Sequence, residues 1–286
     1  MTTLDSHQHF WKYDSSDDFL WITENMAVIR RDFLPEDLAP ELAANGIDRS
    51  IAVQASQSED DTKFLLDLAA THDSIAGVVG WVDLCAANAR ERLREFSRHK
   101  KLRGIRHLVQ SEPDDRFMLR KDFLRGLACL NEFGLTYDIL IYPKQLPAAV
   151  ELVRLMPDQP FVVDHIAKPL VKVREIDSWS RHMRALAAGP NVFCKVSGMI
   201  AEADWKRWRP EDFTPYLDVV LDAFGPERLM FGSDWPVCLI AGTYRQVKQL
   251  VEGYIAQRSG AEQDKRSLAQ AIFGGTAARF YGISET

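Results

Sequence analysis

The sequence is poor in cysteine and has no long apolar run. Its four cysteines, Cys85, Cys129, Cys194 and Cys238, are widely separated and form no Cys-x-x-Cys pair, so a reduced, intracellular protein is the simpler expectation. No window approaches about 18 uninterrupted apolar residues, which argues against a membrane-spanning helix. The amino terminus also lacks the basic start and apolar run of a signal peptide. We therefore predict a cytoplasmic location.

An excess of positive charge is missing as well. The 286 residues carry a net charge of −6, with 46% hydrophobic and 27% charged residues, which is ordinary for a globular protein. This balance provides no electrostatic attraction to nucleic acid or to an anionic membrane surface. We therefore expect neither of these as a partner, and a small molecule is the expected ligand.

Eight short apolar segments alternate with helical segments along the whole chain. The expected strands end at or near residues 9, 55, 82, 107, 141, 165, 197 and 234. The expected helices cover 35–45, 58–72, 86–99, 122–133, 143–156, 178–188, 211–224, 244–258 and 263–273. This pattern, without a break in composition, predicts the α/β class and a single (β/α)8 TIM barrel over residues 1–286. A doubly wound sheet is the alternative, but it requires a glycine-rich first turn, where this chain has His9-Phe10-Trp11.

Two further segments accompany the expected barrel. The aromatic-rich stretch 11–31 has no clear period and is much longer than an ordinary connection of about 4–6 residues, so we expect a loop folded over a pocket. The stretch 244–273 is expected to supply the closing helices.

The first expected strand ends in His7-Gln8-His9. Side chains alternate between the two faces of a strand, so both imidazoles point the same way, about 7 Å apart along the backbone. Two imidazoles in this arrangement can hold one metal ion. The alternative for the pair alone is two polar residues near the start of a domain.

Ionisable and polar residues end most of the other expected strands. In a (β/α)8 barrel the active site lies at the carboxyl ends of the strands, and the residues found there are Gln54, Trp81, Arg106, His107, Asp138, His165, Lys195, Ser197 and Asp234. His165 and Asp234 complete a candidate set of metal ligands with His7 and His9, for zinc or a similar divalent ion. By strand alternation, His165 faces opposite to Asp164.

These residue types are suited to hydrolysis. Asp234 can accept a proton from water and pass it to a leaving group, which predicts cleavage of an ester, lactone or amide. Arg106 is suited to holding substrate oxygens, although an ion pair with Asp138 explains it equally well. Either the Lys195 side chain reaches the pocket, or the expected register of its strand is shifted by one residue, which would place Lys195 on the other face.

The chain resembles the amidohydrolase superfamily, and within it the branch of sugar lactonases of the L-fuconolactonase and L-rhamnonolactonase type. The resemblance rests on Asp5-Ser6-His7-Gln8-His9-Phe10-Trp11, Gly80-Trp81-Val82-Asp83-Leu84, Leu102-Arg103-Gly104-Ile105-Arg106-His107, Asp164-His165-Ile166-Ala167-Lys168-Pro169, Cys194-Lys195-Val196-Ser197-Gly198 and Phe231-Gly232-Ser233-Asp234-Trp235-Pro236-Val237-Cys238. It covers nearly the whole chain.

The resemblance implies that His7, His9 and His165 flank a metal ion or the substrate carbonyl, with Asp234 as the acid and base. It also implies Arg106 and His107 at the substrate, and we assign Gln54, Trp81, Asp138 and Lys195 to the same group. The chain lacks the lysine or glutamate that bridges two metals in the wider superfamily, and Asp138 stands where many relatives have a metal-binding histidine. One zinc ion is therefore expected, and a metal-independent enzyme is the alternative within this branch.

The predicted function is hydrolysis of a sugar lactone, such as L-fuconolactone, to the corresponding aldonic acid in carbohydrate catabolism. One alternative is a lactonase for pyrone dicarboxylates or muconolactones, although such anionic substrates call for more arginines at the strand ends. A second is a metal-dependent decarboxylase on the same barrel. A third, a barrel that binds a ligand without turnover, is disfavoured because a base and metal ligands are both present.

Overall fold

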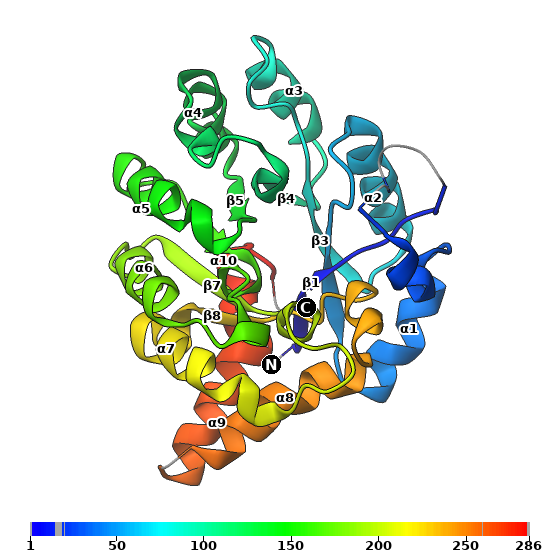
Figure 1. Ribbon diagram of the computed structural model, residues 1–286. Coiled ribbons are helices and arrows are strands. Elements are labelled where there is room, and N and C mark those ends of the chain that lie inside the picture. The colour runs from blue at the N-terminus through cyan, green and yellow to red at the C-terminus, as the bar shows by residue number, and fades with distance from the viewer. Residues whose placement is uncertain (1, 15–18, 20, 259, 285–286) are drawn as a thin grey trace.

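Eight short parallel strands follow one another around a barrel in the order β1 to β8, with helices outside them (Figure 1). The computed structural model describes residues 2–14, 19, 21–258 and 260–284. The strands are β1 (Leu4–Gln8), β2 (Arg49–Val53), β3 (Ile75–Gly80), β4 (Leu102–His107), β5 (Thr136–Ile139), β6 (Phe161–Val163), β7 (Val192–Val196) and β8 (Leu229–Phe231). An isolated parallel bridge between Gln8 and Trp235 joins the two ends of the sheet. The predicted (β/α)8 barrel is confirmed.

Ten α-helices are found among the described residues, and some of them begin at caps or acidic first turns that the sequence supplies. They are α1 (Pro35–Ala44), α2 (Glu59–Thr71), α3 (Ala89–Phe96), α4 (Lys121–Leu127), α5 (Leu146–Leu155), α6 (Asp177–Ala187), α7 (Thr214–Phe224), α8 (Tyr244–Gln257), α9 (Glu262–Gln270) and α10 (Thr276–Phe280). In α2, for example, the Ser58 side chain accepts a hydrogen bond from the Asp61 amide, and three acidic residues occupy the first turn. Within the described residues, no helix is long and apolar enough to cross a membrane.

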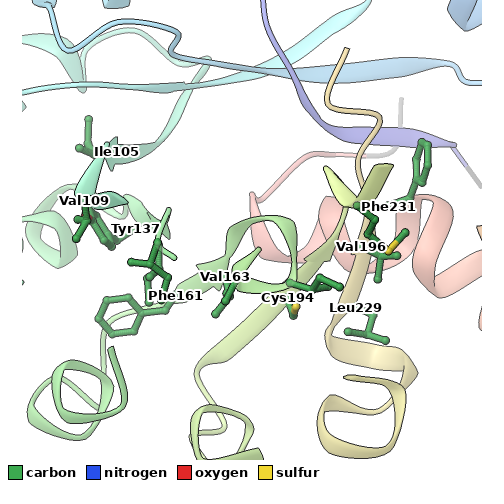
Figure 2. Close-up of a cluster of buried hydrophobic side chains, with 14 of the residues drawn as sticks. Ile105, Val109, Tyr137, Phe161, Val163, Cys194, Val196, Leu229 and Phe231 are labelled. Atoms are coloured by element: carbon green, nitrogen blue, oxygen red, sulfur yellow. The ribbon is translucent and has the colours of Figure 1, made fainter. Parts of the chain in front are cut away.

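Successive strand residues divide the core into two parts. Phe161, Val163, Cys194 and Leu229 belong to the large cluster between the strands and the surrounding helices, and Figure 2 shows them side by side. Val162 and Met230 belong instead to a smaller cluster inside the barrel, where Ala277 and Tyr281 also pack. The interior is therefore closed at one end by α10, which lies against β1 and β8 (Figure 1).

The chain differs from the sequence expectation at the strand ends and at the carboxyl terminus. β6 and β8 end at Val163 and Phe231, two or three residues before the ionisable residues His165 and Asp234. The helix expected over 122–133 is divided into α4 and a 3-10 turn at Leu130–Phe133. A further helix, α10, follows the closing helices and was not expected.

Candidate active site

His7 and His9 leave the end of β1 toward a common point. Their Nε2 atoms lie 3.2 Å apart, much closer than the backbone spacing because the two rings converge. Nδ1 of His9 lies 2.8 Å from the carbonyl oxygen of Val53. Since a carbonyl only accepts, Nδ1 carries the proton and Nε2 presents its lone pair to the site.

Asp234 reaches the same point from the loop after β8. Its Oδ1 atom lies 3.4 Å from Nε2 of His9 and 3.9 Å from Nε2 of His7. Asp234 has a left-handed backbone, with φ of 56°, and its amide donates to the carbonyl of His7 at 2.8 Å. A residue other than glycine held in this conformation stores strain, which is typical of functional sites.

Two glycines give the imidazoles their space. A Cβ atom at Gly232 would lie 2.6 Å from Cβ of His7, so β1 can approach β8 only with glycine at this position. A Cβ atom at Gly198 would lie 2.4 Å from Nδ1 of His165. Both distances are far below ordinary van der Waals contact.

His165 belongs to a left-handed turn rather than to β6. His165, Ile166, Ala167 and Lys168 all have φ between 47° and 56°. Nδ1 of His165 lies 2.9 Å from the Ser197 hydroxyl, and Nε2 lies 3.8 Å from Oδ1 of Asp234. The turn therefore brings the third imidazole to the other two.

Two overlapping groups of donor atoms have spacings that a metal ion could bridge. His7, His9 and Asp234 form one group whose ligand atoms lie within 4.8 Å of one another, and His7, Asp164 and His165 form a second. Around a tetrahedral zinc ion with ligands at about 2.0–2.1 Å, neighbouring donor atoms are about 3.4 Å apart. The measured separations of 3.2, 3.4, 3.8 and 3.9 Å are compatible with that spacing.

The site holds its carboxylate ionised and the imidazoles of His7 and His165 neutral. Burial opposes ionisation of Asp234, but the neighbouring His165 and His9 outweigh it and lower the pKa of this carboxyl. Burial lowers the pKa of His165 to about 4 and holds the pKa of His7 well below its usual value. At neutral pH the arrangement therefore offers a negatively charged base beside two neutral imidazoles, those of His7 and His165.

Asp164 is a central residue that the sequence analysis did not assign. Its Oδ1 lies 3.3 Å from Nδ1 of His7, and its Oδ2 lies 3.0 Å from Nη1 of Arg106. Burial opposes its ionisation, but Lys195, His7 and Arg106 hold its pKa well below the usual range. The expectation that Asp164 and His165 face opposite ways was wrong, because β6 ends at Val163 and strand alternation does not extend to them.

Asp138 and Lys195 lie beneath this cluster. Lys195 Nζ is 2.5 Å from Asp138, 3.0 Å from Asp164 and 3.1 Å from Nδ1 of His7, and the Tyr281 hydroxyl donates to Asp138 at 2.8 Å. Asp138 and Lys195 have no exposed surface, so the substrate contacts expected for them do not match their positions. The pairing considered between Arg106 and Asp138 is also absent, since Arg106 pairs with Asp164 and Asp138 with Lys195.

The other expected substrate residues lie beside the pocket. Gln54 is fully buried and accepts a hydrogen bond from Arg106. The Trp81 indole donates to Nδ1 of His107 at 3.3 Å, while Nε2 of His107 lies 2.7 Å from Glu112. None of Gln54, Trp81 and His107 is among the described residues that line the cavity.

A cavity of about 370 Å³ opens above the histidine cluster. Its polar lining residues are His9, Arg106, Gln110, Ser111, Tyr142, His165, Lys168, Glu202 and Asp234, and its apolar lining residues include Met26, Leu108, Leu140, Val237 and Ile240. Trp21 and Trp205 contribute indole rings. Trp21 and Met26 come from the segment 11–31, of which residues 15–18 and 20 lie outside the described part of the chain.

Comparisons with known proteins agree with this geometry. Residues 4–283 match a family model described as amidohydrolase. The chain is 44% identical to an L-fucono-1,5-lactonase of Burkholderia multivorans, over 99% of this chain and 96% of the relative. The chain belongs to the amidohydrolase family.

Two further members of the amidohydrolase family are similar over the same length. An L-fucono-1,5-lactonase of Burkholderia ambifaria is 37% identical, over 98% of this chain and 95% of the relative. A solved amidohydrolase structure from Burkholderia multivorans, which contains bound zinc, has a TM-score of 0.92 and 44% identity, and the match covers 99% of this chain and 100% of that chain.

Proposed function

We propose that this protein hydrolyses a sugar lactone, of the L-fuconolactone type, to the corresponding aldonic acid. The observation that carries the proposal is the convergence of the Asp234 carboxylate with three imidazoles at the base of a cavity. The two relatives named L-fucono-1,5-lactonase, similar over nearly their entire lengths, support the substrate class.

In the proposed reaction a water molecule attacks the lactone carbonyl carbon. Asp234, held ionised by its neighbours, accepts the proton of that water and returns it to the ring oxygen as the carbon–oxygen bond breaks. The product is a hydroxy acid with its carboxyl and hydroxyl groups on the same chain, and the carboxyl group releases its remaining proton to solvent at neutral pH. Arg106 lines the cavity, and we propose that it holds the carbonyl oxygen by a charge-assisted hydrogen bond from Nη1 in place of its contact with His7.

We propose His7, His9, His165 and Asp234 as the residues that would hold a zinc ion. The lone pair of His9 Nε2, fixed by the Val53 contact, and the donor spacing support this assignment. The chemistry that zinc supplies is polarisation of a carbonyl and a lower pKa for water. One contact favours the metal-independent alternative: Nη1 of Arg106 lies 3.2 Å from Nε2 of His7, the nitrogen that would otherwise face the metal.

The charges of the cavity favour an uncharged substrate. Arg106 and Lys168 are its cationic lining residues, and each is paired with a carboxylate: Arg106 with Asp164 at 3.0 Å and Lys168 with Glu202 at 3.2 Å. A pyrone dicarboxylate, or the carboxylate of a decarboxylase substrate, would need unpaired positive charge here. A sugar lactone instead needs donors and acceptors such as Gln110, Ser111 and Glu202, together with apolar and aromatic walls.

We also propose a cytoplasmic location. The four cysteines are free thiols in the structure, as expected in a reducing compartment.

The test is a screen of the purified protein for acid release from aldonolactones and aromatic-pathway lactones, followed with a pH indicator. Asp234→Asn protein, assayed in parallel, supplies the rate of spontaneous ring opening. We expect rapid acid release from a deoxy-sugar lactone with the wild type alone. Equal rates for both proteins across the sugar lactones would contradict the proposal, and a repeat after chelation would show whether the metal contributes.

A further inference from the structure

A second cavity lies at the amino-terminal end of the barrel, on the face opposite the active site. It has a volume of about 330 Å³ and is bounded by the first residues of β4 and β5 and by the segment 279–282. Its lining includes His99, Lys100, Arg103 and Arg279. Among the described residues that line it there is no aspartate or glutamate, although the whole chain has a net charge of −6.

The other basic residues at the amino-terminal ends of strands are satisfied by the protein itself. Arg49, Lys101 and Arg228 begin or immediately precede β2, β4 and β8. Each donates to a main-chain carbonyl, at distances between 2.6 and 3.2 Å. Neutral acceptors of this kind satisfy the donors of a buried cation without another charge.

Arg103 is the exception within the described part of the chain. Its guanidinium has no hydrogen-bond or ion-pair partner there, and its Nε atom is buried. The side-chain stem is held over Gly77, where a Cβ atom would lie 2.6 Å from Cγ of Arg103. Burial and the charge of Arg49 lower the pKa of Arg103. A half-buried cation whose donors have no partner among the described residues is available to an external anion, which would satisfy them.

We propose that this cavity binds a phosphate group, as inorganic phosphate or as part of a phosphorylated metabolite. The forked guanidinium of Arg103 matches two phosphate oxygens, and Lys100 adds a mobile positive charge at the rim. Arg279 is held by its ion pair with Glu227 at 3.4 Å and contributes a fixed charge. The proposal is independent of the lactonase activity.

Calorimetric titration of the intact protein with inorganic phosphate, at constant ionic strength in chloride buffer, tests the site. We expect a dissociation constant of about 1 mM or tighter, and at least tenfold weaker binding by Arg103→Met. The matched control is Arg228→Met, which immediately precedes β8 on the same face and lies outside the cavity lining; it should keep the wild-type affinity within about threefold. Removal of an unpaired charge should leave the unfolding temperature of Arg103→Met unchanged or raised, so a loss of binding is separable from misfolding.

A parallel titration with a sugar phosphate distinguishes the two sources of the ligand. Tighter binding of the sugar phosphate than of inorganic phosphate, again lost in Arg103→Met, would assign the site to a metabolite, and the reverse order would assign it to free phosphate. Absence of heat with both ligands, or equal binding by the wild type and Arg103→Met, would overturn the proposal.

Discussion

The Ser197 hydroxyl lies 2.9 Å from Nδ1 of His165, where β7 and the turn after β6 end side by side. The next residue, Gly198, has φ of 63° and leaves no room for a Cβ atom beside the same imidazole. The orientation of His165 therefore depends on a hydroxyl and on the absence of a methyl group. This makes Gly198 a positioning residue that does not touch the substrate.

Replacement of Gly198 by alanine should therefore impair catalysis beyond its effect on stability. The new Cβ atom would displace the His165 ring, and we expect kcat to fall at least tenfold. The matched control is Gly134→Ala, because Gly134 has nearly the same φ, 64°, but open space around its Cα atom. Both variants should lose about 1–2 kcal/mol of stability from the left-handed backbone, and Gly198→Ala should lose about 1–3 kcal/mol more from the overlap with His165. Chemical unfolding measures these losses, and only Gly198→Ala should lose activity. Equal kcat values for the two variants would refute the positioning role.

Asp234→Asn should keep the fold and lower kcat by about 10²-fold or more, because an amide cannot accept the proton of the attacking water. The measurement is the initial rate of lactone hydrolysis. Equal unfolding temperatures of the two proteins would first show that the variant is folded. Asp83→Asn, an exposed position outside the cavity lining, should retain wild-type kinetics. Activity of Asp234→Asn within a few-fold of wild type would exclude Asp234 as the base.

His9→Ala should lower the zinc content of the purified protein, because His9 Nε2 is one of the converging donors. Elemental analysis after equilibration with zinc and gel filtration measures the stoichiometry. His182→Ala is the control, since His182 is partly exposed on α6 and bonds only to the Ser178 carbonyl among the described contacts. An unchanged zinc stoichiometry in His9→Ala would rule out this histidine as an important ligand.

The stability of the protein should depend on pH through Asp138. Burial raises the pKa of Asp138 from 3.8 to about 6, although Lys195 acts in the opposite direction. A carboxyl with a raised pKa in the folded state favours folding while protonated, so its contribution is lost as pH rises from about 4 through about 6. The stability of wild type minus that of Asp138→Asn should fall by up to about 3 kcal/mol over this range and stay constant above it.

Urea unfolding of wild type and Asp138→Asn at pH 4.5, 5.5, 6.5 and 7.5 provides the comparison. A difference that increases with pH would show that Lys195 stabilises the carboxylate more than burial destabilises it, contrary to the expected direction.

The sequence predicted the barrel well because alternating strands and helices determine that fold almost alone. It also placed His7, His9, His165 and Asp234 at strand ends, and the structure brings these four together. Strand alternation failed for Asp164, because left-handed turns after β6 are not encoded in hydrophobic periodicity. The sequence also could not predict how far below the cavity Asp138 and Lys195 lie. Strand alternation shows that a residue faces the barrel interior, but it does not distinguish a residue at the substrate from one in the layer below.

Of the residues that contact the buried charges, Tyr281 was the hardest to predict from the sequence. The helix that precedes it, α10, has only five residues, and its contact with Asp138 crosses 143 positions of the sequence. Short segments carry little periodic information, so only the assembled fold reveals this partner.

Two tyrosines from the carboxyl-terminal helical region donate hydrogen bonds to buried carboxylates of the barrel strands. Tyr244 donates to Asp5 across 239 positions at 3.0 Å, as Tyr281 does to Asp138. Contacts between such distant positions require closure of very long chain loops, which makes them slow to form. During refolding, helices and neighbouring strand pairs can therefore appear before the buried charges have their partners. Catalytic activity should therefore return late in refolding, because it requires a closed barrel, whereas helix content does not.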